Sequence, residues 1–169
     1  MHIADLIAGG TDTVSITLNW NFALMCHFPL VQKRAADEID LFVEKHGRLP
    51  TFTERAEVPF CVATYKECMR YRPTTPFGVP HSTNEDGNLK INYQVVLYSF
   101  IFLVAIDGYL IKKDTAIISS MDSMHKNPEI FSEPERFYPE RYLTNLKTMQ
   151  AAANGKLEER DHYNFGWGR

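Results

Sequence analysis

Two short stretches of the sequence place polar side chains inside apolar helical patterns, where they could do chemistry. The first is GGTDT, residues 9–13. Gly9 and Gly10 each weaken a helix interior by roughly 1 kcal/mol relative to alanine, but they let another molecule approach the backbone closely. Thr13 lies one turn after them, so its hydroxyl and the Asp12 carboxylate would border a notch suited to proton delivery. A structural interpretation, in which Asp12 caps a helix that starts late, fits the same residues.

The second stretch is YKECMRYRP, which contains Glu67 and Arg70. The two residues are three apart, so they share one face of a predicted helix, with the acid before the base. Taken alone, such a pair is most simply a surface ion pair that contributes about 0.2–0.5 kcal/mol. Its meaning therefore depends on the segments around it.

A hydrolytic metal site built from His125, Asp161 and His162 is a third possibility. Asp161 and His162 are adjacent, which is not a helical ligand spacing, and the chain contains no HExxH motif. We therefore expect no metal site at these residues.

A mainly α-helical chain with a small β-sheet must position these residues. Residues 4–28 are apolar nearly all round and predict a long helix inside a protein. Pro29 suits the first turn of a second helix that ends at Gly47, and Pro59 opens a third helix that runs through Tyr71. Further along, GYLIKKDTAIISS predicts a strand, a charged turn and a second strand arranged as a hairpin.

The apolar segment 91–106, INYQVVLYSFIFLVAI, does not match its surroundings. Its apolar run is too short to cross a bilayer, which needs about 20 residues. Three interpretations remain open: a buried strand, a membrane-touching loop, and an insertion foreign to the fold. The residue types are those that AT-rich non-coding DNA tends to encode, so the insertion could be a retained intron.

The bulk properties allow one globular domain and disfavour several classes of protein. The 169 residues are 44% hydrophobic with a formal net charge of -3, so the chain lacks the basic stripe of a nucleic-acid-binding protein. Cys26, Cys61 and Cys68 form no CxxC pair, so we expect reduced packing residues. No secretory signal opens the chain. Helix interior follows Met1 almost at once, with no cap residue before it, and a glycine-rich turn stops at Arg169, so we expect both ends to be cut.

Four motifs, in this order along the chain, resemble the cytochrome P-450 family of haem-thiolate monooxygenases. Residues 9–13 resemble the oxygen-activating motif of the family's long I helix. Glu67 and Arg70 match the ExxR pair of its K helix, and Arg141, in FYPERY, matches the arginine that joins this pair in a buried cluster. The resemblance covers nearly the whole chain except residues 91–106.

The fourth motif is NFGWGR, which resembles the opening of the haem-binding loop F-x-x-G-x-R-x-C. Phe165 and Gly168 stand in their places, but the second arginine and the axial cysteine would follow Arg169. The chain itself therefore supplies no metal ligand, and we expect residues 1–169 to be a single incomplete domain that is inactive alone. The resemblance implies a partial cytochrome P-450 fold with I, J and K helices, a small β hairpin and the start of the haem-binding loop.

The resemblance also implies roles for particular residues. Gly9 and Gly10 would leave room for oxygen and substrate beside haem b, and Asp12 and Thr13 would deliver protons during dioxygen activation. His81, in GVPH, resembles a position that binds a haem propionate, although it could equally be a histidine at a strand edge. Phe165 and Gly168 would contact the cofactor as well.

The parent enzyme would insert one oxygen atom into a lipophilic organic substrate, with electrons from an NADPH-dependent reductase. Eukaryotic members of the family are usually anchored to the endoplasmic reticulum membrane by their N-terminal part. An alternative from a different class is a non-catalytic helical structural or interaction protein. In that case Glu67, Arg70 and Arg141 would only hold its core together. A buried charge cluster needs full pairing, and that role is purely structural.

Overall fold

The chain folds into two units by its internal contacts. The computed structural model describes residues 3–83, 96–98, 101–106, 109–145, 147–156 and 159–166. The helical unit comprises Met1–Pro76 and Met121–Arg169, and the strand unit comprises Phe77–Ser120.

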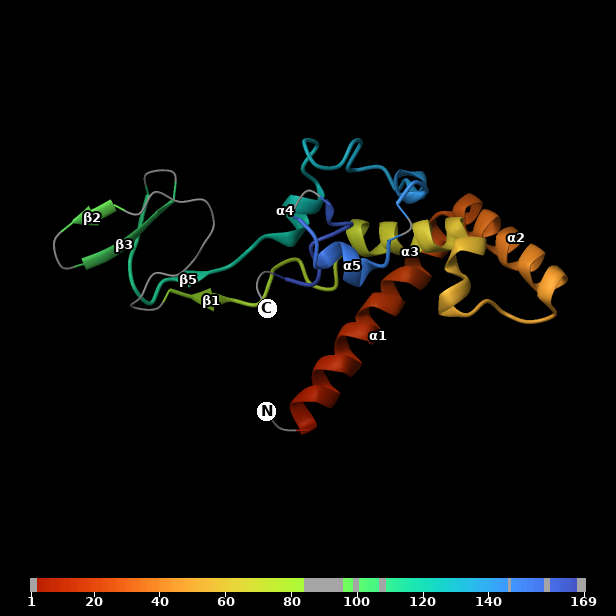
Figure 1. Ribbon diagram of the computed structural model, residues 1–169, viewed down its shortest axis with the longest axis horizontal. Helices are drawn as coiled ribbons and strands as arrows, with labels where there is room; N and C mark the ends of the chain where they lie inside the picture. Colours follow the sequence, from red (N-terminus) through yellow and green to blue (C-terminus); the bar gives the residue numbers. More distant parts are fainter. Residues whose placement is uncertain are drawn as a thin grey trace. The chain divides into compact units, whose positions relative to one another are not determined.

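The helical unit carries the residues around Glu67. Its elements are α1 (Ile3–His27), α2 (Pro29–His46), the 3-10 helix η1 (Phe52–Glu57), α3 (Pro59–Tyr71), α4 (Met121–His125), the 3-10 helix η2 (Pro139–Tyr142) and α5 (Met149–Ala153) (Figure 1). The prediction of a helix from Pro59 through Tyr71 is confirmed. The predicted end of α2 is also confirmed, because Gly47 adopts the left-handed conformation (φ 68°) and its N–H bonds to the Val43 carbonyl.

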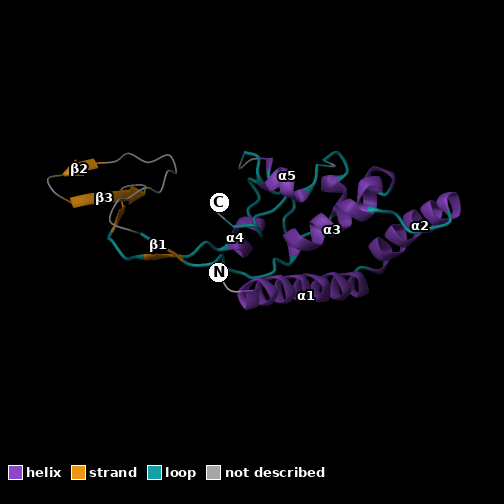
Figure 2. Cartoon of the chain, turned by 60° about the horizontal axis from the view of Figure 1, so that its bottom comes forward, coloured by secondary structure: helices purple, strands orange, loops and turns teal. Residues whose placement is uncertain are grey.

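An elbow at Phe28 joins α1 to α2, and the two helices meet at an angle of 106° (Figure 2). Phe28 has non-helical backbone angles (φ -117°, ψ 69°), as expected for a residue before a proline. Its ring stacks on Phe137, with centroids 4.5 Å apart. The same contact region contains Leu24 and Cys68, so the core of this unit lies where α1, α3 and the chain before η2 meet.

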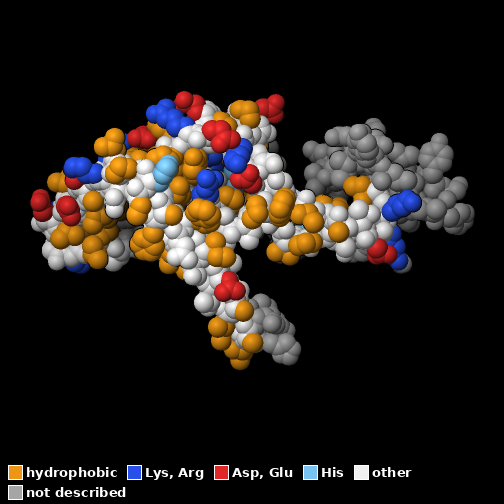
Figure 3. Space-filling model, turned by 180° about the vertical axis from the view of Figure 1, so that it is seen from behind, with side chains coloured by type: hydrophobic (Ala, Val, Ile, Leu, Met, Phe, Trp, Pro, Cys, Tyr) orange, Lys and Arg blue, Asp and Glu red, His pale blue; other side chains and the backbone are white. Residues whose placement is uncertain are grey.

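The prediction that α1 is buried all round is wrong for most of this helix. Leu24 is buried, but Ile7 is 63% exposed, Leu18 is 47% exposed and Phe22 is 69% exposed. Figure 3 shows apolar side chains along the surface of this helix. Among the described residues, no single helix has the length and apolar character to span a membrane, and only the bent pair α1 and α2 together meet those criteria.

The strand unit contains two antiparallel sheets. One pairs β1 (His81–Ser82) with β5 (Ala116–Ile117), and the other has the order β2 (Val96–Tyr98), β3 (Ile101–Ile106), β4 (Tyr109–Ile111). The predicted hairpin is therefore wrong, because β4 and β5 belong to different sheets. Thr83 explains the difference. Its backbone and hydroxyl form hydrogen bonds with backbone groups of Lys112, Asp114 and Thr115, which lie in the expected turn. These backbone groups therefore pair with Thr83 instead of closing a hairpin.

The apolar segment 91–106 lies partly outside the described residues, which omit 84–95, 99 and 100. Where it is described, its backbone forms β2 and β3, with Val96 opposite Leu103. A strand is thus present here. Whether the segment is foreign to the fold stays a hypothesis.

Candidate functional site

The helix α3 is fixed at its N-terminal end, which makes it a firm support for the residues it carries. Pro59 occupies its first turn, where the missing N–H is not needed. The Glu38 carboxylate of α2 accepts hydrogen bonds from the backbone N–H groups of Phe60 (3.0 Å) and Cys61 (2.8 Å). An acidic group at a helix N-terminus satisfies free amides and complements the helix dipole.

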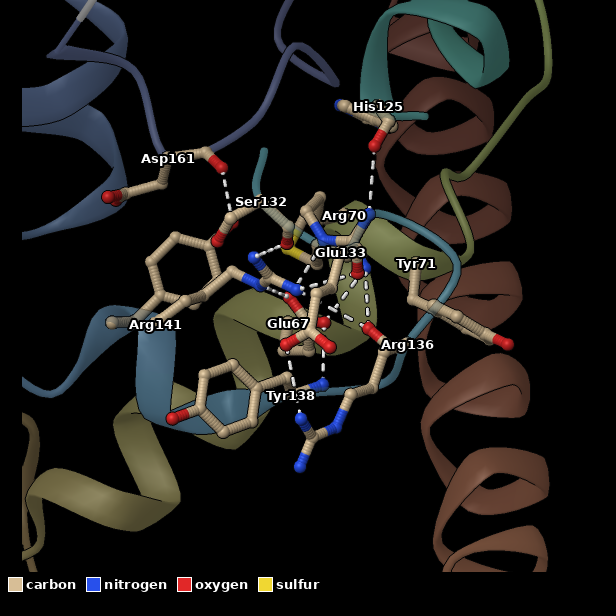
Figure 4. Close-up of polar contacts among 12 residues, drawn as sticks. Glu67, Arg70, Tyr71, His125, Ser132, Glu133, Arg136, Tyr138, Arg141 and Asp161 are labelled. Atoms are coloured by element: carbon tan, nitrogen blue, oxygen red, sulfur yellow. Dashed lines mark hydrogen bonds and ion pairs between the residues drawn. The ribbon is translucent and has the colours of Figure 1, made fainter. Parts of the chain in front are cut away.

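Glu67 and Arg70 form a buried two-point ion pair on α3 (Figure 4). Arg70 Nε donates to Glu67 Oε2 and Arg70 Nη2 donates to Glu67 Oε1, both at 2.8 Å. Their side chains are 1% and 0% exposed. Arg70 Nη1 also donates to the carbonyl of His125 at 2.8 Å, so the guanidinium ties α3 to α4.

Arg141 reaches the same carboxylate from η2. Its Nε donates to Glu67 Oε2 at 3.0 Å, and its Nη1 donates to the Ser132 carbonyl at 2.7 Å. The backbone N–H of Tyr138 donates to Glu67 Oε1 at 2.8 Å. The structure thus brings Glu67, Arg70 and Arg141 together. Both carboxylate oxygens are engaged, so the arrangement suits holding the chain rather than acid–base chemistry.

Sequence reasoning missed a second buried charge, Lys66, next to Glu67 on α3. Its side chain and that of Asp161 are each 1% exposed, and Lys66 Nζ lies 3.0 Å from Asp161 Oδ2. The sequence offered only a spacing: Lys66 stands three residues after Ala63 and four before Arg70, on the helix face that the structure shows to be buried. A lysine on a buried helix face needs an anionic or carbonyl partner.

His125, Asp161 and His162 do not form a metal centre. Within the described ranges, no group of three or more histidine, cysteine or acidic residues is placed to hold a metal ion. Instead, His125 Nε2 accepts a hydrogen bond from the backbone N–H of Tyr163 at 2.8 Å. Burial, assisted by the Arg70 charge, lowers the pKa of His125 to about 4, so this ring is neutral near pH 7.

The GGTDT segment lies on an open face of α1. The Thr13 hydroxyl donates to the Gly9 carbonyl at 2.8 Å, one turn earlier. A side chain added at Gly9 or Gly10 would meet no atom within 4 Å. Asp12 and Thr13 are both exposed. The helix is continuous through these residues, so the interpretation in which Asp12 caps a late helix start is wrong.

The structure does not gather the remaining predicted site residues. Phe165 is 57% exposed, and its ring centroid lies 5.2 Å from that of His162. Gly168 lies outside the described residues. His81 is exposed at the start of β1 in the strand unit.

Comparison with known proteins identifies the family of the chain. The family profile described as Cytochrome P450 matches residues 1–96 and 100–169. The chain belongs to the cytochrome P450 family. A cytochrome P450 monooxygenase named acuD, from Aspergillus aculeatus, is 33% identical over 165 residues, which cover 97% of this chain and 28% of that protein. The mouse steroid 21-hydroxylase is 31% identical over 155 residues, which cover 92% of this chain and 28% of that protein.

Solved structures support the same assignment. A zebrafish cytochrome P450 determined with abiraterone has a TM-score of 0.65 and 29% identity, over 83% of this chain and 30% of that one. The mainly helical fold therefore matches part of the cytochrome P450 fold. The chain spans 28% of the length of the first curated relatives it matches.

Cytochrome P450 proteins of full length hold haem, and a haem-thiolate centre needs a cysteine that ionises readily. Burial raises the pKa of Cys61 and of Cys68 to about 12, which opposes thiolate formation. Cys61 Sγ also donates to the Ala35 carbonyl at 3.3 Å. Cys26 is exposed near the end of α1. Cys61 and Cys68 therefore do not fit the axial ligand, and Cys26 lies within α1 and not in a glycine-rich loop. The open Gly9–Thr13 face nevertheless leaves space for a large group.

Proposed function

We propose that this chain is part of a haem-dependent monooxygenase that activates dioxygen and inserts one oxygen atom into a lipophilic organic substrate. One observation carries the proposal. In a chain of the cytochrome P450 family, the buried Glu67 carboxylate is shared by Arg70 and Arg141, and the same helical unit carries the open GGTDT face. Haem b, when bound in the parent protein, supplies the dioxygen chemistry.

The residues of α1 border the reacting molecules in this proposal. Gly9 and Gly10 leave room for oxygen and substrate, since nothing lies within 4 Å of a side chain added there. Thr13 Oγ1 and the Asp12 carboxylate are both exposed and hold and pass protons on this face. Contacts to the cofactor come from His81, Phe165 and Gly168.

Glu67, Arg70 and Arg141 have a structural role. Glu67 accepts hydrogen bonds from the guanidinium groups of both arginines and from the Tyr138 amide, so it fixes the chain before η2 against α3. A carboxylate held by this many donors acts as an anchor. The cluster thereby holds the wall of the site without taking part in the reaction.

By itself the 169-residue chain forms no thiolate-ligated haem centre in this proposal, because none of its cysteines fits the ligand. The axial cysteine lies in a parent protein longer than this chain. That parent receives electrons from an NADPH-dependent reductase. It contacts the endoplasmic reticulum membrane through a part of its sequence outside these residues.

Haem reconstitution tests this function. The parent protein, extended past Arg169 by its own coding sequence, should bind haem stoichiometrically and show a thiolate-type Soret band when reduced under carbon monoxide. The 169-residue chain should show no such band. Thr13→Ala in the parent should keep the band but lower the share of electrons that reach product, whereas Ser15→Ala, also exposed on α1, should not. A parent that binds no haem would instead support the non-catalytic structural protein.

We also propose that residues 91–106 are an insertion into the family fold. The family match is interrupted at residues 97–99, inside this segment, and it includes residues 91–96 and 100–106. The proposal therefore rests on the composition of the segment and on this short break. Sequencing the mature transcript tests it, because a spliced message that still encodes residues 91–106 contradicts a retained intron.

A further inference from the structure

Lys66 uses its ammonium group to join separate parts of the chain. Its Nζ donates to the carbonyls of Asn145 and Lys147, both at 2.7 Å. It also lies 3.0 Å from Asp161 Oδ2, as an ion pair and not a third hydrogen bond. The buried charge thus has two hydrogen-bond acceptors and an opposite charge beside it, and a buried charge needs such partners to be tolerated.

The partners of Lys66 lie on both sides of α5. Asn145 and Lys147 come before this helix, and Asp161 comes after it. Asn145 Nδ2 donates to Asp161 Oδ1 at 3.0 Å, which joins the same two points directly. Lys66 therefore brings the two ends of the loop 148–160 together on α3.

The chain directly after this loop is held by independent contacts. The Tyr142 hydroxyl donates to the Asp161 carbonyl at 2.6 Å, and Asn164 Nδ2 donates to the Met69 carbonyl at 2.7 Å. The Tyr163 amide donates to His125 Nε2 at 2.8 Å. Residues 161–164 thus follow a fixed path across α3 and α4, beginning at the Lys66–Asp161 contact.

We infer that Lys66 and Asp161 are positioning residues, which close the loop 148–160 on α3 and set where residues 161–166 begin. Glu67 fixes the chain before η2, and its neighbour Lys66 fixes the chain after it, so two consecutive side chains of α3 determine both paths. The consequence for haem rests on the proposed function, because residues 165–169 would then lead into the cofactor loop. The anchoring itself does not depend on that function.

Hydrogen exchange in the 169-residue chain tests the inference without haem. Lys66→Met should raise the exchange rate of the Tyr163 amide by about tenfold or more, and the Tyr138 amide, which donates to Glu67, should change by less than about twofold. Asp161→Asn should give the same pattern. The double variant should exceed neither single variant by more than about twofold, because both changes remove the same Lys66–Asp161 contact. The matched control is Lys45→Met, which removes an exposed ion pair to Glu57 and should alter neither amide.

Asp161→Asn provides the measurement if Lys66→Met does not fold. Equal acceleration at Tyr163 and Tyr138 would mean a general loss of stability and would overturn the inference. Unchanged exchange at Tyr163 in both variants would overturn it as well. Haem binding by the parent has no bearing on either result, so a failure here is distinct from a failure of the proposed function.

Discussion

Glu67 and Arg141 lie 74 residues apart in the sequence, yet Arg141 Nε donates to Glu67 Oε2 at 3.0 Å. This contact, with the Arg70 pair, gathers three charged side chains, and those of Glu67 and Arg70 are 0% and 1% exposed. Removing one member of such a cluster leaves the others buried without a partner.

Glu67→Gln should therefore destabilise the chain strongly. The amide cannot balance the charges of Arg70 and Arg141, so we expect the free energy of unfolding to fall by about 3–5 kcal/mol. Urea denaturation followed by circular dichroism measures this. Asp37→Asn, which breaks the exposed Lys33–Asp37 pair, is the control and should change the value by less than about 0.5 kcal/mol. Similar unfolding midpoints for the two variants would contradict the role of Glu67 as an anchor.

Acidification should destabilise the chain through two buried histidines. Burial lowers the pKa of His125 to about 4 and that of His162 to about 3, with the Arg70 charge assisting at His125. Below about pH 6.5 the unfolded chain therefore binds more protons than the folded chain. The contribution of these histidines to the free energy of unfolding is full above that pH and is lost as the pH falls toward their folded-state pKa values. The loss should reach about 2 kcal/mol per histidine at pH 5. Denaturant titrations between pH 7.5 and pH 5 measure the slope.

His125→Gln should reduce that slope by roughly half. His27→Gln, at an exposed position of α1, should leave it unchanged. Asp161 acts in the opposite direction, because burial raises the pKa of its carboxyl and this contribution favours the folded state as pH falls. An unfolding free energy that does not change between pH 7.5 and pH 5 would contradict the prediction that the buried His125 and His162 rings are neutral.

Alanine at Gly9 or Gly10 should stabilise this chain. Both positions are helical and open, so each substitution should raise the free energy of unfolding by up to about 1 kcal/mol. Gly47→Ala is the matched control. It should instead lower stability by about 1 kcal/mol, because Gly47 has a positive φ of 68°. Thermal melts by circular dichroism compare the three variants, and a loss of stability at Gly9 would mean that another group already covers this face.

Glu38→Ala should weaken the start of α3. It removes the acceptors of the Phe60 and Cys61 amides, at a cost of about 1–2 kcal/mol. Glu44→Ala, at an exposed position of the same helix α2, should cost less than about 0.5 kcal/mol. Equal effects in urea denaturation would show that the Glu38 carboxylate does not cap α3.

Local patterns in the sequence predicted the features that depend on near neighbours. Pro59 and the residues before Pro73 define α3, and Gly47 defines the end of α2, because backbone restrictions act within a turn. The Glu67–Arg70 pair follows from helix geometry in the same way. Arg141 was linked to it through family resemblance, because nothing local joins residues so far apart.

Long-range contacts explain what sequence reasoning missed. Lys66 and Asp161 meet only in the folded chain, and Thr83 takes the place of a hairpin partner from a distant position. The exposure of α1 was also missed, since an apolar pattern indicates a preference for burial and does not supply the surface that buries it.

The elbow at Phe28 has a consequence for how the chain folds as it leaves the ribosome. Pro29 prevents one continuous helix as soon as both helices exist, because its restriction on the backbone of Phe28 is local. Two contacts that hold α2 come from residues synthesised later: Phe28 stacks on Phe137, and Glu38 accepts from the Phe60 and Cys61 amides. The nascent chain therefore acquires its bend before it has these contacts.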